Sequence, residues 1–207
     1  MSEPSAKNRI SDKTYIRILD AAAQLYRKQG YAAVSMRAIA EASEIKAGSL
    51  YYHFDSKEDI VIEILNLGIK MVHDEVSRVI ADLPDNATGS QTIRAGIRGH
   101  LHALLEYRNY TSANVRIYGQ VPPRIQRLNL TARRKYEKFW DDLLSDLQKN
   151  GQLRQQIDIA SFRLLLIGAL NATLEWFDQE KGDCSVLADN YTDLLLNGIL
   201  ENREFKA

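Results

Sequence analysis

SMRAIAEASEIKAGSLYYHFDSK, residues 35–57, is the stretch of sequence that decides the fold, because it holds two short helical segments separated by a turn. Ser35 is a typical N-cap residue in front of a helix predicted over residues 36–42, and a second helix is predicted over about residues 46–53. Residues 43–45 form the turn between them. Two short helices joined in this way cross each other, so that the second can enter the major groove of DNA. The stretch therefore predicts a helix-turn-helix.

Helical periodicity continues on both sides of this stretch. Residues 11–29 place apolar side chains such as Ile18, Leu25 and Tyr26 on one face and are followed by Gly30, a typical C′ residue. Ser56 and the acids after it open a long helix that ends near Pro84. Further helices are predicted over residues 91–107, 113–120, 124–150, 159–179 and 186–201, and no strand-like alternation is found. About nine helices predict an all-α protein.

The composition agrees with a helical protein of two parts. Only four prolines and 11 glycines occur in 207 residues, and 45% of the residues are hydrophobic, which is ample for a packed core. We predict an N-terminal three-helix helix-turn-helix domain over residues 1–55. A larger C-terminal helical bundle, over residues 56–207, is predicted to bind an effector and to dimerise.

Several features predict a cytoplasmic protein. The single cysteine, Cys184, excludes an internal disulfide, and residues 1–8 are polar rather than the apolar run of a signal peptide. The longest apolar stretch, residues 164–170, is flanked by Arg163 and Asn171 and falls short of the roughly 20 residues of a membrane span. We therefore expect no membrane partner.

The charge is informative only locally. The formal net charge is zero, so the whole chain does not indicate a polyanionic partner. Residues 7–57, however, contain nine Lys and Arg against five Asp and Glu, an excess of +4. This modest excess lies on the predicted helix-turn-helix, where DNA would bind.

Six groups of residues resemble the N-terminal domain of the TetR family of transcriptional regulators. They are ILDAA at 18–22, GY at 30–31, VSMR at 34–37, IA at 39–40, GSLYYHF at 48–54 and SKE at 56–58. The resemblance covers about residues 11–60, and it implies the following contacts. Ser35 and Arg37 would contact DNA. The residues that would enter the major groove are Lys46, Ala47, Gly48 and Ser49. The residues that would contact phosphates are Tyr51, Tyr52, His53 and Lys57. Leu50 and Phe54 would lie in the hydrophobic core.

Two positions depart from the family pattern. Glu44 stands in the turn where glycine is common, and Lys46 stands where a serine or threonine commonly caps the second helix. Lys46 replaces a capping hydroxyl with a cation that reaches guanine O6/N7 or a phosphate, so we expect it to contribute to operator preference. For the aromatic residues 51–53 the alternative is a packed corner of a small helical domain.

The last two predicted helices carry wide apolar faces. Such a pair suits a symmetric four-helix interface between two subunits, in which Gly168, Ala169 and Ala172 permit close approach. TetR-like regulators are similar in dimerising through this pair. Burial within a single bundle is the alternative for each of these residues.

An effector pocket is expected among the middle helices. The arginines of residues 113–152, together with residues 171–176, resemble regulators that respond to acyl-coenzyme A thioesters, and these arginines would hold the ligand's phosphates. The predicted lining residues are Tyr107, Tyr110, Arg116, Tyr118, Arg124, Phe139, Asn171 and Trp176. The alternative is a set of ordinary core aromatics and a charged helix face.

Catalytic and metal-binding motifs are missing. No GxSxG, P-loop or GxGxxG occurs, and His100 and His102 point to different faces of a helix. We therefore expect no enzyme, no cofactor and no metal. The expected function is a homodimeric repressor that binds double-stranded operator DNA and is released by a small hydrophobic or CoA-thioester effector. Activation of transcription is an alternative, as is a helical ligand-binding or scaffold protein whose helix-turn-helix does not function.

Overall fold

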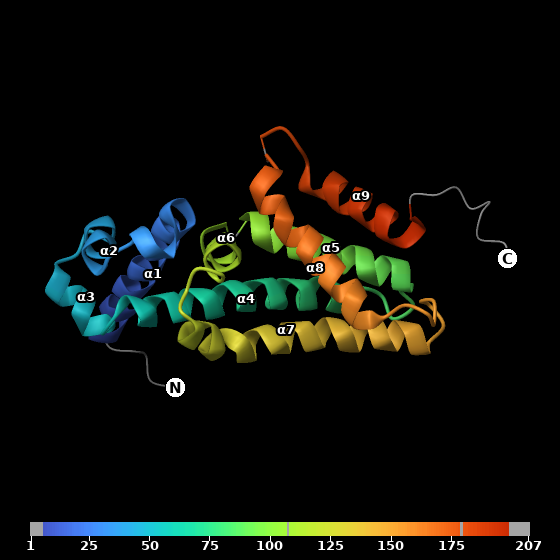
Figure 1. Ribbon diagram of the computed structural model, residues 1–207, viewed down its shortest axis with the longest axis horizontal. Coiled ribbons are helices and arrows are strands. Elements are labelled where there is room, and N and C mark those ends of the chain that lie inside the picture. Colours follow the sequence, from blue (N-terminus) through green and yellow to red (C-terminus); the bar gives the residue numbers. More distant parts are fainter. Residues whose placement is uncertain (1–5, 107, 179, 199–207) are drawn as a thin grey trace. The chain divides into compact units, whose positions relative to one another are not determined.

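The computed structural model describes residues 6–106, 108–178 and 180–198, and within these ranges it contains nine helices and no strand (Figure 1). The first four helices are α1 (Ala6–Ala33), α2 (Met36–Ala42), α3 (Ala47–His53) and α4 (Lys57–Ala81). The remaining five are α5 (Gly89–Glu106), α6 (Arg108–Ile117), α7 (Pro123–Lys149), α8 (Ile159–Trp176) and α9 (Cys184–Asn197). The predicted all-α fold is confirmed.

Most helix ends lie where local sequence places them. Gly30 has a φ of 76° and breaks the helical backbone of α1, as expected for a C′ glycine. The Ser35 hydroxyl accepts a hydrogen bond from the Ala38 amide at 3.2 Å, so Ser35 is the N-cap of α2. The last helix was predicted over residues 186–201, but α9 ends at Asn197, and Gly198 with a φ of 72° is its C-cap.

The start of α6 was predicted wrongly. The helix was expected over residues 113–120, but it begins at Arg108 and ends at Ile117. Thr111, Ser112 and Asn114 are buried on this helix although they are polar. Their composition resembles that of a loop, and only tertiary packing turns the segment into a helix.

The residues group into two compact units. Unit 1 contains Met1–Met71 and Tyr107–Tyr136, and unit 2 contains Val72–Glu106 and Glu137–Ala207. Both α4 and α7 are divided between the units, so no single cut in the sequence separates them. The predicted division into domains of residues 1–55 and 56–207 stays a prediction.

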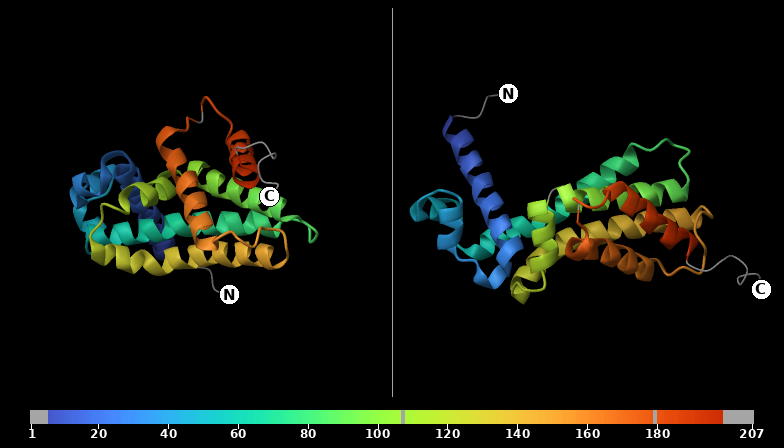
Figure 2. Two further views of the ribbon diagram at one scale, coloured as in Figure 1. Left: turned by 45° about the vertical axis from the view of Figure 1, so that its right-hand side comes forward. Right: turned by 90° about the horizontal axis from the view of Figure 1, so that it is seen from above.

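Unit 1 has one hydrophobic core that joins the helix-turn-helix to later helices. The core is built from α1 to α4, α6 and the start of α7, and it includes Ile18, Ile39, Leu50, Ile64, Ile117 and Ile125. α6 packs along α1 (Figures 1 and 2). The helices that would face DNA therefore share their core with α6 and α7.

Polar side chains link α4, α6 and α7 within unit 1. The Arg133 guanidinium donates to Asn129 at 3.0 Å and to Asn114 at 2.8 Å. It also lies 3.4 Å from the centre of the Tyr118 ring, a cation–π contact. Asn129 in turn donates to Asn66 of α4 at 2.9 Å. These bonds hold the start of α7 against α4, because buried amides without partners would be costly.

Unit 2 packs α5 against both α8 and α9. Its largest buried side chain is Trp140, against which Gly96 lies so closely that a Cβ there would be 2.6 Å from the indole. On the side of α9, Arg94 and Arg98 both form ion pairs with Asp189 at 2.8 Å. These ion pairs join residues more than 90 positions apart, so they help to hold α9 against α5.

Candidate nucleic-acid interface

The turn between α2 and α3 has a left-handed residue. The Ser43 hydroxyl ends α2 by donating to the Ile39 carbonyl at 2.6 Å, and Glu44 follows with a φ of 55°. The Ile45 amide then donates to the Ala40 carbonyl at 3.1 Å. Glycine adopts this conformation with less strain than glutamate, which explains why glycine would suit the position. The turn backbone is nevertheless formed with Glu44.

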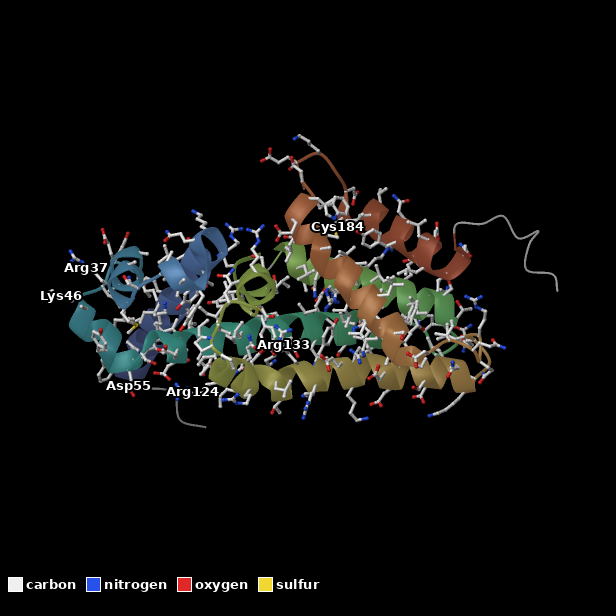
Figure 3. The ribbon with its side chains drawn as sticks, viewed as in Figure 1. Arg37, Lys46, Asp55, Arg124, Arg133 and Cys184 are labelled. Atoms are coloured by element: carbon white, nitrogen blue, oxygen red, sulfur yellow. The ribbon has the colours of Figure 1, made fainter. Side chains whose placement is uncertain are left out.

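The start of α3 is an exposed surface of small side chains next to one cation. Lys46 is the N-cap residue of α3 and makes no capping bond with its side chain. Ala47, Gly48 and Ser49 are all exposed, and Figure 3 shows Lys46 before α3 and Arg37 on α2. A Cβ placed on Gly48 would meet nothing within 4 Å. Packing within the chain therefore does not explain a glycine that costs a helix about 1 kcal/mol relative to alanine.

The end of α3 has a buried and an exposed side. Leu50 is fully buried and Phe54 is 5% exposed, so both belong to the core as expected. Tyr51 and Tyr52 are 55% and 77% exposed. His53 is half-buried, and its ring packs edge-on against Tyr52 at a centroid distance of 5.2 Å. The two tyrosines are thus available to a partner, whereas His53 also contributes to packing.

Lys57 has partners within the protein that the sequence did not indicate. Its Nζ donates to the carbonyls of Tyr31 and Val34 at 3.0 and 2.9 Å and lies 4.1 Å from the centre of the Tyr31 ring. These contacts tie the start of α4 to the connection between α1 and α2. An ammonium group has three donors, so one N–H is left for a phosphate.

The two units carry opposite charge although the chain is neutral. Unit 1 contains 17 Lys and Arg against nine Asp and Glu, a net charge of +8, and unit 2 contains ten against 18, a net charge of −8. Within the described residues of unit 2, ion pairs with carboxylates are formed by Arg78, Arg94, Arg98, Lys138, Lys149, Arg163 and Lys181. The positive unit is the one that contains the helix-turn-helix, as expected for binding to DNA.

Four of the predicted effector-binding residues that the structure describes lie in unit 1. The Tyr110 hydroxyl donates to Asp20 of α1 at 2.6 Å, and burial, followed by this bond, raises the pKa of Tyr110. Arg116 donates to a carbonyl of α1 at 3.3 Å, and Tyr118 lies under an arginine of α7. Arg124 is exposed (Figure 3). Three of the four therefore already have partners within the protein.

The other predicted effector-binding residues belong to unit 2 or are not described. Tyr107 lies outside the described residues. The Phe139 ring is edge-on to a histidine of α4 at 5.1 Å, and Asn171 Oδ1 is 3.2 Å from His100 Nε2. Trp176 is exposed on α8. The predicted effector pocket stays a prediction.

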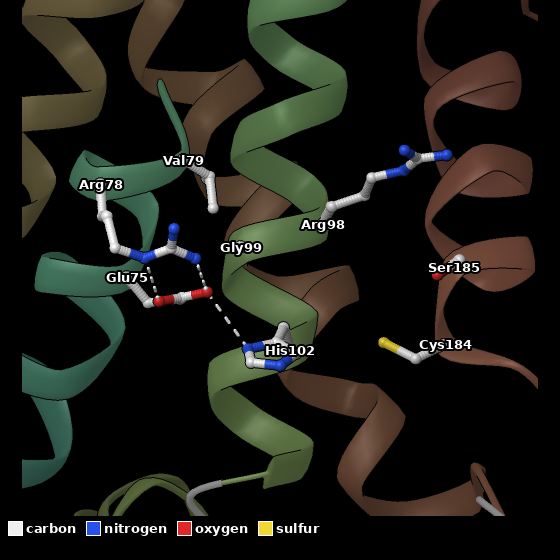
Figure 4. A pocket seen from close by; sticks show the side chains of 8 residues that line it. All are labelled: Glu75, Arg78, Val79, Arg98, Gly99, His102, Cys184 and Ser185. Carbon is white, nitrogen blue, oxygen red and sulfur yellow. Dashed lines mark hydrogen bonds and ion pairs between the residues drawn. The ribbon is translucent and has the colours of Figure 1, made fainter. Parts of the chain in front are cut away.

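A pocket of about 270 Å³ in unit 2 is formed by residues that sequence analysis did not predict as effector-binding. It is lined by Glu75, Arg78, Val79, Arg98, Gly99, His102, Cys184 and Ser185 (Figure 4). A hydrogen bond from Arg78 is the main cause that lowers the pKa of Glu75, which also contacts His102 at 3.2 Å. Burial, followed by the charge of Asp183, raises the pKa of Cys184, so this thiol stays protonated. Among the described residues, no group of three or more His, Cys, Asp or Glu side chains is arranged to hold a metal ion.

Two family models match the chain. Residues 18–64 match the model described as bacterial regulatory proteins, tetR family, and residues 86–199 match the model described as tetracyclin repressor-like, C-terminal domain. The second match alone covers more than half of the 207 residues. The chain belongs to the TetR family. This TetR-family protein is a regulator of transcription and not an enzyme, and the resemblance found over residues 11–60 is confirmed.

The relatives of this TetR-family protein are distant in sequence but similar in length. The fatty acid metabolism regulator protein of Bacillus subtilis (strain 168) is 24% identical over 194 residues, which are 89% of this chain and 95% of the relative. The HTH-type transcriptional repressor KstR2 of Rhodococcus jostii (strain RHA1) is 29% identical over 190 residues, 88% and 89% of the two chains. The crystal structure of FadR from Bacillus subtilis in complex with stearoyl-CoA has a TM-score of 0.76 at 22% identity, covering 90% of this chain and 100% of that one.

In this TetR-family protein α8 presents an apolar stripe to solvent. The exposed residues recur at three- and four-residue spacing and are Leu164, Leu165, Gly168, Ala172 and Trp176. With 18 residues, α8 is the one described helix that is long and apolar enough to cross a membrane. Length and composition are weak evidence for that, because core helices of water-soluble proteins meet the same criterion. A stripe of this kind more often marks a protein interface.

Proposed function

We propose that this TetR-family protein is a cytoplasmic repressor that binds operator DNA as a homodimer and is released by an acyl-CoA. The observation that carries the DNA-binding part is the start of α3. There, exposed small residues follow an N-cap cation, Lys46, and Gly48 has no packing role. Close approach of a groove to the α3 backbone accounts for both features.

The contacts with DNA divide into two kinds. Lys46 and residues 47–49 of α3 enter the major groove, where Lys46 reaches guanine O6/N7 and contributes to sequence preference. Ser35, Arg37, Tyr51, Tyr52 and His53 contact phosphates or base edges next to it, and the remaining N–H of Lys57 contacts a phosphate. The functional boundary lies near residue 55, where α3 ends and α4 begins.

Dimerisation is proposed through the stripe of α8, together with α9. Gly168 and Ala172 lie in the middle of the stripe and let two copies of the helix approach closely. α9 adds exposed Val186 and Leu194. An interface between two subunits explains why these apolar side chains are exposed in one chain.

The effector proposal rests on the relatives. The Bacillus subtilis relative is named a fatty acid metabolism regulator, and a FadR of the same organism has been solved with stearoyl-CoA. Among the predicted residues of unit 1, Tyr110 and Tyr118 would contact the acyl group, and Arg116 and Arg124 the phosphates. Release from DNA requires that the acyl-CoA bind one dimer geometry better than the other.

The proposed function is tested by fluorescence anisotropy with an operator selected from random duplexes. Wild type is expected to prefer this operator over scrambled DNA by about 10³-fold or more and to show a steep salt dependence. Lys46→Ala should lose more affinity for the operator than for scrambled DNA. Stearoyl-CoA should weaken operator binding, whereas free CoA and stearate serve as controls. Absence of any specific duplex would refute operator binding, and binding that no acyl-CoA changes would refute only the effector.

Gly48→Ala is expected to improve stability and to damage function. Alanine in an exposed helix should raise the free energy of unfolding by up to about 1 kcal/mol. The added Cβ, which meets nothing in the free protein, should separate α3 from the groove and weaken operator binding at least about tenfold. Gly119→Ala is the matched control, because a Cβ at Gly119 also meets nothing within 4 Å. Equal operator affinities of Gly48→Ala and wild type would show that α3 does not approach DNA closely.

A further inference from the structure

The connection between α1 and α2 is an irregular segment on which the direction of the helix-turn-helix depends. It begins at Gly30, whose φ of 76° ends the regular part of α1, and it ends at Ser35, the N-cap of α2. A rotation of this segment would turn α2, and with it α3, which follows after a short turn. The segment must therefore be held in place for α3 to meet a groove correctly.

Tyr31 is the residue by which this connection is held. Its carbonyl and ring are bound by Lys57 of α4, as described above. Its hydroxyl donates to Glu58 at 3.2 Å, and burial, followed by the charge of Glu58, raises the pKa of Tyr31 to about 12. α4 thus secures the carbonyl and the side chain of Tyr31 but not its amide.

The amide of Tyr31 is bound from the other side by Gln120, in the turn after α6. Gln120 Oε1 accepts from the Tyr31 amide at 2.9 Å, and Gln120 Nε2 donates to the carbonyl of Arg116 at 3.0 Å. The amide group lies against Gly30 so closely that a Cβ there would be 2.6 Å from Oε1. One side chain therefore connects the last turn of α6 to Tyr31, the residue that follows the break in α1.

We infer that Gln120 is a positioning residue for operator binding. Other bonds from α6, such as that of Tyr110 to Asp20, reach α1 before its break and do not contact the connection itself. Gln120 acts beyond the break, where it fixes the orientation of the connection relative to α6. Because the side chain is exposed, its loss should change the orientation of α2 and α3 more than the stability of the fold.

The test compares three variants in operator and scrambled-DNA binding, and it rests on the operator binding proposed above. Gln120→Leu keeps the size of the side chain but removes the acceptor, and it should weaken operator binding about tenfold. Gln120→Glu keeps an acceptor for the Tyr31 amide and should stay within about threefold of wild type. Binding to scrambled DNA should be unchanged in both, because phosphate contacts tolerate reorientation.

Gln148→Leu is the matched control. Gln148 is a glutamine of α7 whose Nε2 donates to the carbonyls of Arg154 and Ile157 at 3.1 and 3.0 Å. It supports the segment after α7 and has no bond to the α1–α2 connection or to the turn that contains Gln120, so its loss should leave operator affinity unchanged. Melting temperatures of all variants should stay within about 4 °C of wild type.

Each outcome decides the question. Wild-type affinity of Gln120→Leu, or an equal loss in Gln120→Glu or Gln148→Leu, would overturn the role of Gln120. If wild type itself binds no duplex specifically, the proposed function is refuted, and the role of Gln120 in operator binding is refuted with it.

Discussion

Gly168→Arg is expected to yield a folded monomer that binds operator DNA at least about 100-fold more weakly than wild type. A Cβ at Gly168 meets nothing within 4 Å in the single chain, so the new side chain disturbs no packing there. Arginine is also a better helix former than glycine, which excludes a local loss of α8. The folded chain should therefore tolerate the substitution.

The dimer should not tolerate it. Gly168 lies in the middle of the exposed stripe of α8, so two symmetric copies would bring two guanidinium groups into one apolar interface. Burying a charge without a partner costs about 3–5 kcal/mol, which raises the dissociation constant of the dimer by a factor of more than about 100. A monomer contacts only one half-site and loses the gain of binding two at once.

Light scattering and anisotropy measure the two effects. The scattering mass should fall to that of one chain, 23.5 kDa, while the helical circular dichroism is retained. Leu128→Arg on α7 is the control, since Leu128 is also an exposed apolar residue but lies outside the stripe. A dimeric Gly168→Arg protein with normal operator affinity would place the interface elsewhere on the molecule.

The stability of the protein is expected to fall as the pH drops from about 6.5 to about 4, because of His100. This residue lies on α5 with its Nε2 3.2 Å from Asn171 Oδ1 of α8, and burial lowers its pKa from 6.5 to about 4. The Asn171 oxygen only accepts, so Nε2 carries the proton of a neutral ring. In this pH range His100 binds a proton in the unfolded chain but stays neutral in the folded chain.

The direction in which the free energy of unfolding changes with pH follows from the protons bound by the two states. Above pH 6.5 the ring is neutral in both states, and the full stability is present. Between pH 6.5 and 4 the unfolded state binds more protons, so the free energy of unfolding decreases, in total by on the order of 3 kcal/mol. Glu75, Asp158 and Asp189 have lowered pKa values and add to acid instability, but only below their ordinary values of 4.5 and 3.8.

Urea unfolding at pH 7.0, 5.5 and 4.5 checks this prediction, at one chain concentration because the stability of a dimer depends on it. His100→Gln has an amide that can donate to Asn171 and does not titrate. Its unfolding free energy should therefore decrease less than that of wild type between pH 7.0 and 4.5. The same decrease in both proteins would show that His100 is protonated in the folded state or that other groups cause the loss.

The fold of the helix-turn-helix was predictable because its determinants are local. Ser35 caps α2 through its own hydroxyl, Gly30 breaks α1 through its own φ, and Lys46 lacks a capping oxygen in the structure as in the sequence. Leu50 and Phe54 face the core because they are four residues apart on one helix. Each of these inferences needs only neighbours within one or two turns.

The remaining features depend on distant partners, which a single sequence does not reveal. For Lys57 the sequence predicts only a phosphate contact, which stays a prediction. It does not reveal the two carbonyls that bind Lys57, because they belong to residues 23 and 26 positions earlier. Gln120 was not singled out, because nothing distinguishes a glutamine in a turn until its partner, 89 residues away, is known. The aromatic residues chosen for the effector pocket face the same difficulty, since composition does not separate a lining residue from a core residue.

The opposite charges of the two units bear on how the protein searches for DNA. A neutral chain would be expected to gain little from long-range attraction to DNA. Here, however, the unit that contains α3 is positive and the other unit is negative, so DNA attracts the first and repels the second. Encounters in which the helix-turn-helix leads are favoured over the last 8–10 Å or so, the distance over which charges act in cellular salt. The acidic unit meanwhile discourages adhesion to RNA and to DNA in unproductive orientations. The arrangement thus speeds productive collisions without making the whole protein adhere to every polyanion in the cell.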